Sequence, residues 1–313
     1  MSGTKLPATL SLDLDNQWAY MRVHGDAGWE KFPSYFDRVV PRILSTLRKR
    51  QLRITVFVVG QDAARAENRA ALRTIAEAGH EIGNHSFHHQ PSIADKPEAE
   101  VEAELAQAES AIADAAGHRP VGYRAPGFAI SAATLSALQR RGYAYDASTF
   151  PTSLGPLARM YYRSTTSNGA GGAEQKNLYG GWREALRPLR PHRLPVPHEK
   201  LLEIPVTTFP GMRTPIHLTY LLFAMERSRK LALSYFRAAM WSCAAAKVPP
   251  SLLLHPLDFL GSDDVPELAF FPGMRIRGEE KTSFVGDVLD ILCERFQPVP
   301  LHDFATLHAS LAV

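Results

Sequence analysis

The chain has 313 residues, of which 45% are hydrophobic and 21% are charged, and its net charge is +3. This length allows one large domain or two small ones, and so mild a charge, without a Lys/Arg run interleaved with aromatic residues, argues against a nucleic-acid partner. The chain has two cysteines, Cys243 and Cys293, and no CxxC motif, so neither a disulfide framework nor a zinc ribbon is indicated.

Residues 1–16 contain no basic segment followed by an apolar run and a small-residue cleavage site. No uninterrupted apolar run along the chain reaches the ~18 residues that a membrane-spanning helix needs. We therefore expect a soluble, cytoplasmic protein.

Most of the chain alternates between strand-like and helix-like patterns. The predicted strands are 8–14, 53–59, 80–84, 120–123, 143–148, 201–207, 251–254 and 297–301. The predicted helices are 36–47, 63–78, 97–116, 131–141, 218–246 (as one helix or two), 282–296 and 302–312. Because no change of composition and no internal repeat divides the chain, we predict a single α/β domain over residues 1–313, built on a parallel sheet.

Two segments interrupt this alternation. Residues 18–35 are predicted to form a loop rich in aromatic residues, which either line a groove or pack locally. Residues 152–200 are rich in glycine, proline and arginine and show no periodicity, which predicts a long irregular insertion.

The segment Glu81 to His89, EIGNHSFHH, holds three of the 12 histidines within five residues. His85 and His89 are four residues apart, a spacing that places two imidazoles on one face of a helical turn and is typical of a metal site. His88 would lie on a different face, and we expect it to be a bystander. The alternative is a loop that is rich in histidine by chance.

Two acidic residues end the first predicted strand. Asp13 and Asp15 alternate with Leu12 and Leu14, so both carboxylates are expected on the same side of the strand. Like charges so close together are unfavourable on an otherwise apolar strand, which favours a functional role over a solvated strand end.

Together these side chains suggest metal-assisted hydrolysis. Asp15, His85 and His89 offer one oxygen and two nitrogens, the kind of set that leaves positions open on a catalytic zinc ion. Such a metal lowers the pKa of bound water to about 7 and polarises a carbonyl group. Attack on an amide or ester also needs a base and an acid. Asp13 is placed for the base, and His255, directly after the predicted strand 251–254, for the acid.

The remaining polar candidates also follow predicted strands, where barrel-like α/β folds place their active sites. Arg124, between a strand and Pro126, is expected to hold a carboxylate ionised through a bidentate pair. Asp146 is a further candidate. The histidines without a matching partner are expected on the surface or in loops: His24, His118, His192, His198, His217, His302 and His308.

Four motifs occur in an order that resembles a known family. They are Asp-x-Asp at 13–15, His-Ser-x-x-His at 85–89, Arg-Ala-Pro-Gly at 124–127 and Leu-x-His-Pro at 253–256. This order resembles the polysaccharide deacetylases with the NodB homology domain, carbohydrate esterase family 4. The resemblance implies a distorted (β/α)7 barrel and metal-dependent removal of N-acetyl or O-acetyl groups from sugars.

The resemblance also implies roles for individual residues. It casts Asp13 as general base, His255 as general acid and Arg124 as the residue that positions the base. It casts Asp15, His85 and His89 as metal ligands. A backbone N–H near Gly127 would complete the oxyanion site, and we predict that Gly127, Trp18 and Tyr123 contact the substrate.

The sequence departs from the common family pattern in two places. Leu14 separates the two acids and Asn16 follows them, which looks like a divergent branch that includes peptidoglycan deacetylases without secretion signals, allantoinase-like proteins and deformylases of lipid-linked aminoarabinose. The usual motif of an acid followed by tryptophan has no clear match, which leaves Asp146 and Asp258 as candidates to orient His255. The segment LLEIPVTT at 201–208 resembles the deformylase branch.

We therefore predict a metal-dependent hydrolase that removes an acetyl or formyl group from an amino sugar in a polysaccharide, lipid-linked or nucleotide-linked glycan. Two alternatives stay open: an amidohydrolase for a non-sugar amide, and a non-catalytic carbohydrate-binding relative. Zinc suits the ligand set, and nickel, cobalt, iron or manganese would also bind it. The segments 152–200 and 218–240 are expected to cover the cleft or to touch a membrane surface if the substrate is lipid-linked, and a homo-oligomer is open.

Overall fold

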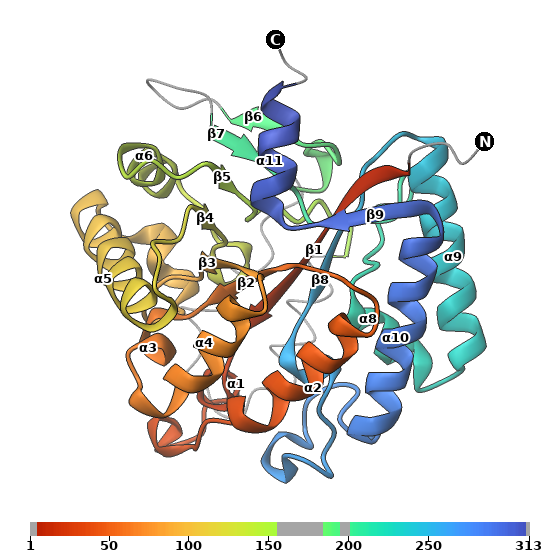
Figure 1. The fold of residues 1–313 in the computed structure, drawn as a ribbon, viewed down its shortest axis with the longest axis horizontal. Helices are drawn as coiled ribbons and strands as arrows, with labels where there is room; N and C mark the ends of the chain where they lie inside the picture. The colour runs from red at the N-terminus through yellow and green to blue at the C-terminus, as the bar shows by residue number, and fades with distance from the viewer. Residues whose placement is uncertain (1–4, 155–183, 195–200, 311–313) are drawn as a thin grey trace.

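The computed structural model describes residues 5–154, 184–194 and 201–310 (Figure 1). A curled, mostly parallel sheet runs through the molecule. Its strands, in chain order, are β1 (Leu6–Leu14), β2 (Thr55–Val58), β3 (Glu81–Asn84), β4 (Gly122–Tyr123), β5 (Tyr145–Asp146), β6 (His192–Leu194), β7 (Leu201–Glu203), β8 (Ser251–Leu254) and β9 (Phe296–Val299).

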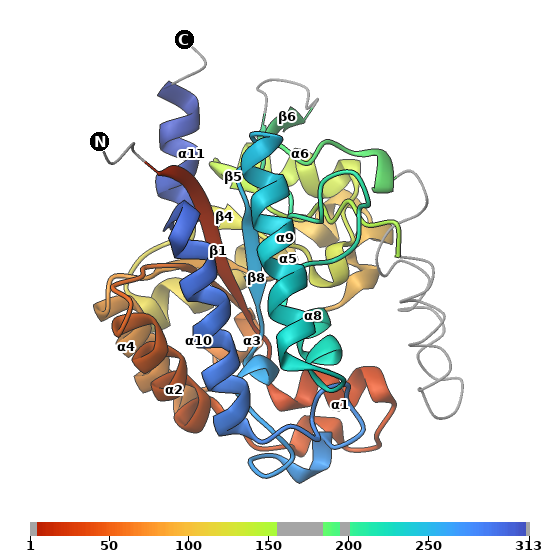
Figure 2. The same cartoon turned by 90° about the vertical axis from the view of Figure 1, so that its right-hand side faces the viewer.

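Helices surround this sheet (Figures 1 and 2). They are α1 (Gln17–His24), α2 (Phe36–Arg48), α3 (Gly60–Ala63), α4 (Arg69–Glu77), α5 (Glu98–Ala116), α6 (Ala132–Arg140), α8 (Leu218–Met225), α9 (Arg229–Ala245), α10 (Gly278–Arg295) and α11 (Leu301–Ser310). Most lie on its outer face, whereas α11 packs Phe304 against interior residues that include Phe57. The alternation of strand and helix confirms the predicted α/β class.

The strand order is β6-β7-β5-β4-β3-β2-β1-β8, and β9 pairs with the beginning of β1. All of these pairs are parallel except β6 with β7. Beyond β7 the chain curls back toward β8, where the amide of Thr207 donates to the carbonyl of Ser251 at 3.0 Å. This single backbone bond stands where a further strand ladder would close the ring, so the sheet is the predicted barrel in a distorted, incompletely closed form.

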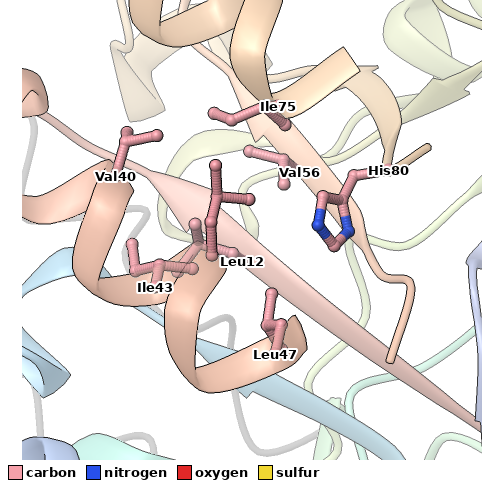
Figure 3. Close-up of a pocket in the computed structure, with 8 residues that line it drawn as sticks. Leu12, Val40, Ile43, Leu47, Val56, Ile75 and His80 are labelled. Atoms are coloured by element: carbon pink, nitrogen blue, oxygen red, sulfur yellow. The ribbon is translucent and has the colours of Figure 1, made fainter. Parts of the chain in front are cut away.

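Strand β1 separates a helix-facing side from an interior side. Leu10, Leu12 and Leu14 are buried in the large core beneath α2 and α10, while Ser11 and Asp13 alternate with them and point inward. A cavity of about 10 Å³ lies on the helix-facing side, against α2 (Figure 3). Its lining is apolar apart from His80: Leu12, Val40, Ile43, Leu44, Leu47, Val56, Ile75 and His80. A void this small is a packing defect. We therefore expect a functional site on the interior side of β1.

Two predicted segments differ in the structure. Helix α1 occupies part of the expected aromatic loop 18–35, because Asn16 caps it by accepting from the amide of Gln17. The expected helix 63–78 is instead α3, a short turn and α4, with Asn68 donating to the carbonyl of Asp62 across the break. Most of the predicted insertion 152–200 lies outside the described residues, and its described part includes β6.

Within the described ranges, no helix is both long and apolar enough to cross a membrane.

Candidate active site

The structure brings the predicted site residues to the carboxyl edge of the sheet. Asp13 lies near the end of β1 and Asp15 follows that strand, His85 follows β3, Arg124 follows β4 and His255 follows β8. Parallel strands that run side by side end at one edge, which explains why residues so far apart in the chain meet.

Asp15, His85 and His89 form the one cluster in the described residues with the donor set of a metal site, and their ligand atoms all lie within 4.8 Å of one another. Asp15 Oδ1 is 3.1 Å from His89 Nε2 and 3.5 Å from His85 Nε2. That oxygen is buried without a hydrogen-bond partner. His85 Nδ1 lies 2.7 Å from the carbonyl of Arg124, so Nδ1 carries the proton and Nε2 presents its lone pair to Asp15. The arrangement fits a divalent cation.

The pKa shifts of Asp15 and His85 favour the protonation states that bind a metal. Burial alone raises the pKa of Asp15, but the imidazoles of His89 and His85, with His255 behind them, reverse this effect and hold the pKa far below its usual range. Burial lowers the pKa of His85, which keeps its imidazole neutral. An ionised carboxylate and a neutral imidazole are the forms that bind a metal.

The two histidines do not lie on a helical turn, so that part of the prediction is wrong. Ser86 and His89 have positive φ angles of 60° and 53°, which end any helix at once. Local side-chain bonds stabilise the resulting loop: Asn84 Oδ1 accepts from the amide of Ser86 at 2.8 Å, and Ser86 Oγ accepts from the amide of His89 at 3.1 Å. A tight loop, rather than helical periodicity, brings His85 and His89 together.

Two charged residues clamp this loop from outside. Arg22 on α1 donates to the carbonyls of His88 and His89, and it stacks on Trp18 and Trp29. From the other side, Glu104 on α5 accepts from the amides of residues 87 and 88 and pairs with the ring of His88 at 2.7 Å. His88 therefore points away from Asp15. Neither Arg22 nor Glu104 stood out in the sequence, because each acts through backbone atoms of a distant segment.

Asp13 and Arg124 form a buried ion pair beside the cluster. Arg124 Nη1 lies 2.8 Å from Asp13 Oδ1 and 2.8 Å from Ser11 Oγ, and its Nε donates to the carbonyl of Ala147 at 2.9 Å. The expected bidentate geometry is not formed, since Nη2 has no hydrogen-bond partner. Asp13 Oδ2 faces the cluster instead, 3.9 Å from His85 Nε2.

His255 begins a short turn at the end of β8. Its side chain accepts from the amide of Asp258, and the Asp258 carboxylate accepts from the His255 amide at 2.7 Å. Burial raises the pKa of Asp258 to about 6. Asp258 thus orients His255 through this reciprocal cap. In the described part of the chain, Asp146 contacts Ser148 and Glu203 rather than His255.

His217 was expected on the surface or in a loop, and it lies in the bend before α8 but is buried. It is 4% exposed and precedes α8, with its ring centroid 6.2 Å from that of His255 and 5.1 Å from that of Phe150. Burial lowers its pKa well below the usual value, and the charges of His255 and Arg124 add to this. Its spacing in the sequence gave no signal, since the fold alone brings α8 to the end of β8.

The three predicted substrate contacts differ in their surroundings. Tyr123 and Trp18 are fully buried. Trp18 packs edge-on against the ring of His89, with centroids 6.5 Å apart, so it supports the position of His89 directly. Gly127 is half-buried in the turn after β4, with a φ of 59°. Only Gly127 of the three presents surface at the strand edge.

A buried acid that the sequence did not indicate fixes the segment after Asp15. Asp62 Oδ1 accepts from Asn16 Nδ2 at 2.8 Å and from Trp18 Nε1 at 2.9 Å. Burial raises the pKa of Asp62 to about 6, against the effect of these two bonds. Tyr35 adds a 2.5 Å bond from its hydroxyl to the carbonyl of Asp15. These contacts fix the segment that follows β1.

The family model for polysaccharide deacetylases matches residues 26–145, which include His85, His89 and Arg124. This part of the chain is similar to the polysaccharide deacetylase family. The other motif residues, Asp13, Asp15 and His255, lie outside the matched range, and the structure is what unites them with it.

Similar curated proteins point the same way. The chain is 33% identical to a peptidoglycan deacetylase of Helicobacter pylori over 107 residues, 34% of this chain and 36% of that protein. It is also 33% identical to a peptidoglycan-N-acetylglucosamine deacetylase of Bacillus cereus over 86 residues, 28% of this chain and 30% of that protein. The chain thus matches about a third of the length of these two relatives.

Solved structures share the fold over the whole chain. A candidate polysaccharide deacetylase from Mycobacterium smegmatis aligns with a TM-score of 0.61 at 18% identity, covering 100% of this chain and 96% of that one. Puue allantoinase aligns with a TM-score of 0.56 at 15% identity, covering 98% and 91%. The two scores establish the shared deacetylase-type barrel.

Proposed function

We propose that this protein is a metal-dependent hydrolase that removes an N-acyl group, acetyl or formyl, from an amino sugar. The observation that carries this proposal is the adjacency of two units. One is the Asp15, His85 and His89 cluster, whose Asp15 Oδ1 has no hydrogen-bond donor. The other is Asp13, whose Oδ2 points at that cluster while Arg124 occupies its Oδ1.

A divalent metal held by Asp15, His85 and His89 would supply a Lewis acid for the amide carbonyl and would lower the pKa of the attacking water. Asp13 acts as general base and receives the water proton at Oδ2. Arg124 pairs with this carboxylate and fixes its orientation from the other side. His255 gives a proton to the amine nitrogen as the C–N bond breaks, which yields the free amino sugar and a carboxylate.

The buried surroundings support these roles. Asp13 and Arg124 are almost completely shielded from solvent, so their attraction is little screened. The Asp258 cap holds His255 at the strand end, in the position proposed for the general acid.

The substrate is proposed to be a glycan rather than a small ureide, since the curated relatives are named for peptidoglycan. The test is release of acetate or formate from a panel of polymeric, nucleotide-linked and lipid-linked amino sugars plus allantoin, with and without chelator. Release from one sugar class that chelator abolishes is the expected result. Release from allantoin alone would favour the non-sugar alternative, and sugar binding without release would favour a binding protein.

Cytoplasmic location, membrane contact and self-association stay predictions. Helices α8 and α9 expose Phe223, Leu231 and Trp241, each more than half accessible, on the outside of the barrel. Flotation with vesicles of anionic lipid, compared with sedimentation equilibrium of the free protein, would distinguish a membrane from a second copy of the chain on this face.

A further inference from the structure

A second pair of acidic side chains lies on β5 and β7, the two strands that follow β4 in the sheet. Asp146 ends β5 and Glu203 ends β7, and the register of these two parallel strands places them side by side. Both side chains are 0% exposed. Arg124, which follows β4, forms its ion pair with Asp13. Two carboxyl groups therefore share a dry environment, an arrangement that disfavours two negative charges.

The two acids accept hydrogen bonds from the segment that follows β5. Asp146 Oδ1 accepts from Ser148 Oγ at 2.5 Å, and Ser148 Oγ in turn accepts from the amide of Ala125 at 2.8 Å. Glu203 Oε1 accepts from the amide of Thr149 at 2.9 Å. Residues 146–149 are thus tied to β7 on one side and to the segment after β4 on the other.

This supported segment supplies the acceptor that orients Arg124. The carbonyl of Ala147, between the two anchoring bonds, accepts from Arg124 Nε at 2.9 Å. Arg124 then reaches Asp13 through Nη1. A shift of residues 146–149 would move Arg124 and, with it, Asp13 Oδ2.

The remaining oxygens of the pair, Asp146 Oδ2 and Glu203 Oε2, are buried without another hydrogen-bond partner. Burial raises the pKa of Asp146, and burial together with the charge on Asp146 raises the pKa of Glu203 well above its usual value. The titratable neighbour on β4, Tyr123, stays neutral because burial raises its pKa as well. One proton retained between the two acids would satisfy both oxygens.

We propose that Asp146 and Glu203 share one proton, and that this pair is the support that positions Arg124 and, through it, Asp13. The catalytic part of this inference rests on the function proposed above. A protonated carboxyl group and an amide have the same shape and both donate a hydrogen bond. Glutamine at position 203 should therefore replace the protonated acid, whereas alanine should not.

Three variants test the positioning role: Glu203→Gln, Glu203→Ala and the control Glu81→Gln. Glu81 begins β3 at the opposite edge of the sheet and accepts from Tyr145 and Thr55, so it matches Glu203 in type but not in place. We expect Glu203→Ala to lower kcat at least about tenfold with KM changed less than about twofold. Glu203→Gln should keep kcat within about threefold of wild type, and Glu81→Gln should leave kcat unchanged. Wild-type kcat in Glu203→Ala would overturn the positioning role.

The shared proton has a signature that needs no substrate. At pH 8, infrared spectra should show a carboxylic-acid C=O band that is lost in Glu203→Gln and kept in Glu81→Gln. Asp62 and Asp258, with pKa values of about 6, are ionised at that pH. A band that persists in Glu203→Gln, or no band in wild type, would overturn the proton sharing. Absence of acyl release by the wild type would instead reject the proposed function and leave this spectroscopic result standing.

Discussion

Arg124 contacts one oxygen of Asp13 and leaves the other free: Nη1 lies 2.8 Å from Oδ1, while Oδ2 faces His85 Nε2 at 3.9 Å. One carboxylate is therefore divided between a permanent cation and the proposed metal site. Arg124 therefore holds Oδ1, while Oδ2 stays directed at the proposed metal site.

Replacing Asp13 by asparagine tests the separate roles of the two carboxylate oxygens. The amide oxygen can still accept from Arg124, but the side chain can no longer take a proton, so we expect acyl release to fall by about 10²–10⁴-fold. The metal content of the purified variant, measured by mass spectrometry, should equal that of wild type because Asp13 is not one of the three proposed ligands. Turnover close to wild type would remove Asp13 as the base.

Alanine substitutions at the three neighbouring histidines should separate ligands from bystander. His85→Ala and His89→Ala each remove one nitrogen of the cluster and are expected to lose bound metal and activity together. His88→Ala removes an exposed ring that pairs with Glu104 and should retain both. If His88→Ala lost metal as completely as His85→Ala, the ligand assignment would be wrong.

The clamp on the histidine loop should tune metal affinity. Arg22→Met removes the donors to the carbonyls of His88 and His89, so we expect about 10–100-fold weaker metal binding, the usual effect of disturbing outer-shell contacts. A chelator competition measures this affinity without any substrate. The control Arg237→Met loses an exposed ion pair with Glu294 and should leave the affinity unchanged.

Buried His217 makes stability depend on acid pH. Its folded pKa lies below the ordinary value of 6.5, so the unfolded chain binds the proton more readily, and stability is lost as pH falls below 6.5. The loss approaches about 1.4 kcal/mol per pH unit for one proton. His217→Phe removes this group, so the drop in melting temperature between pH 7 and pH 5 should be smaller than in wild type. An equal drop in both proteins would show that His217 does not control this transition.

The sequence predicted the elements of this fold better than their junctions. Periodicity predicted the strands at whose ends Asp13, His85 and His255 lie, because buried strands and amphipathic helices leave strong local patterns. It missed α1, whose start depends on the Asn16 cap. It also placed His85 and His89 on a helical turn, where left-handed residues instead form a loop.

The motif residues of the candidate site were visible because their spacing is local or resembles a family. The supporting residues were not. Glu203, Asp62 and His217 each act through partners more than 30 residues away or across neighbouring strands, so no window of sequence reports them. Position in the folded sheet, not composition or spacing, gives these side chains their roles.

Strand β1 has consequences for how the chain is made. It pairs with β2 along its second half, but with β8 in its middle and with β9 at its start. The strand that carries Asp13 thus waits for two partners that are synthesised more than 235 residues later. Such distant pairing slows folding and exposes an apolar strand meanwhile. Chains that end before residue 299 should therefore be more prone to aggregation than chains that include both partner strands.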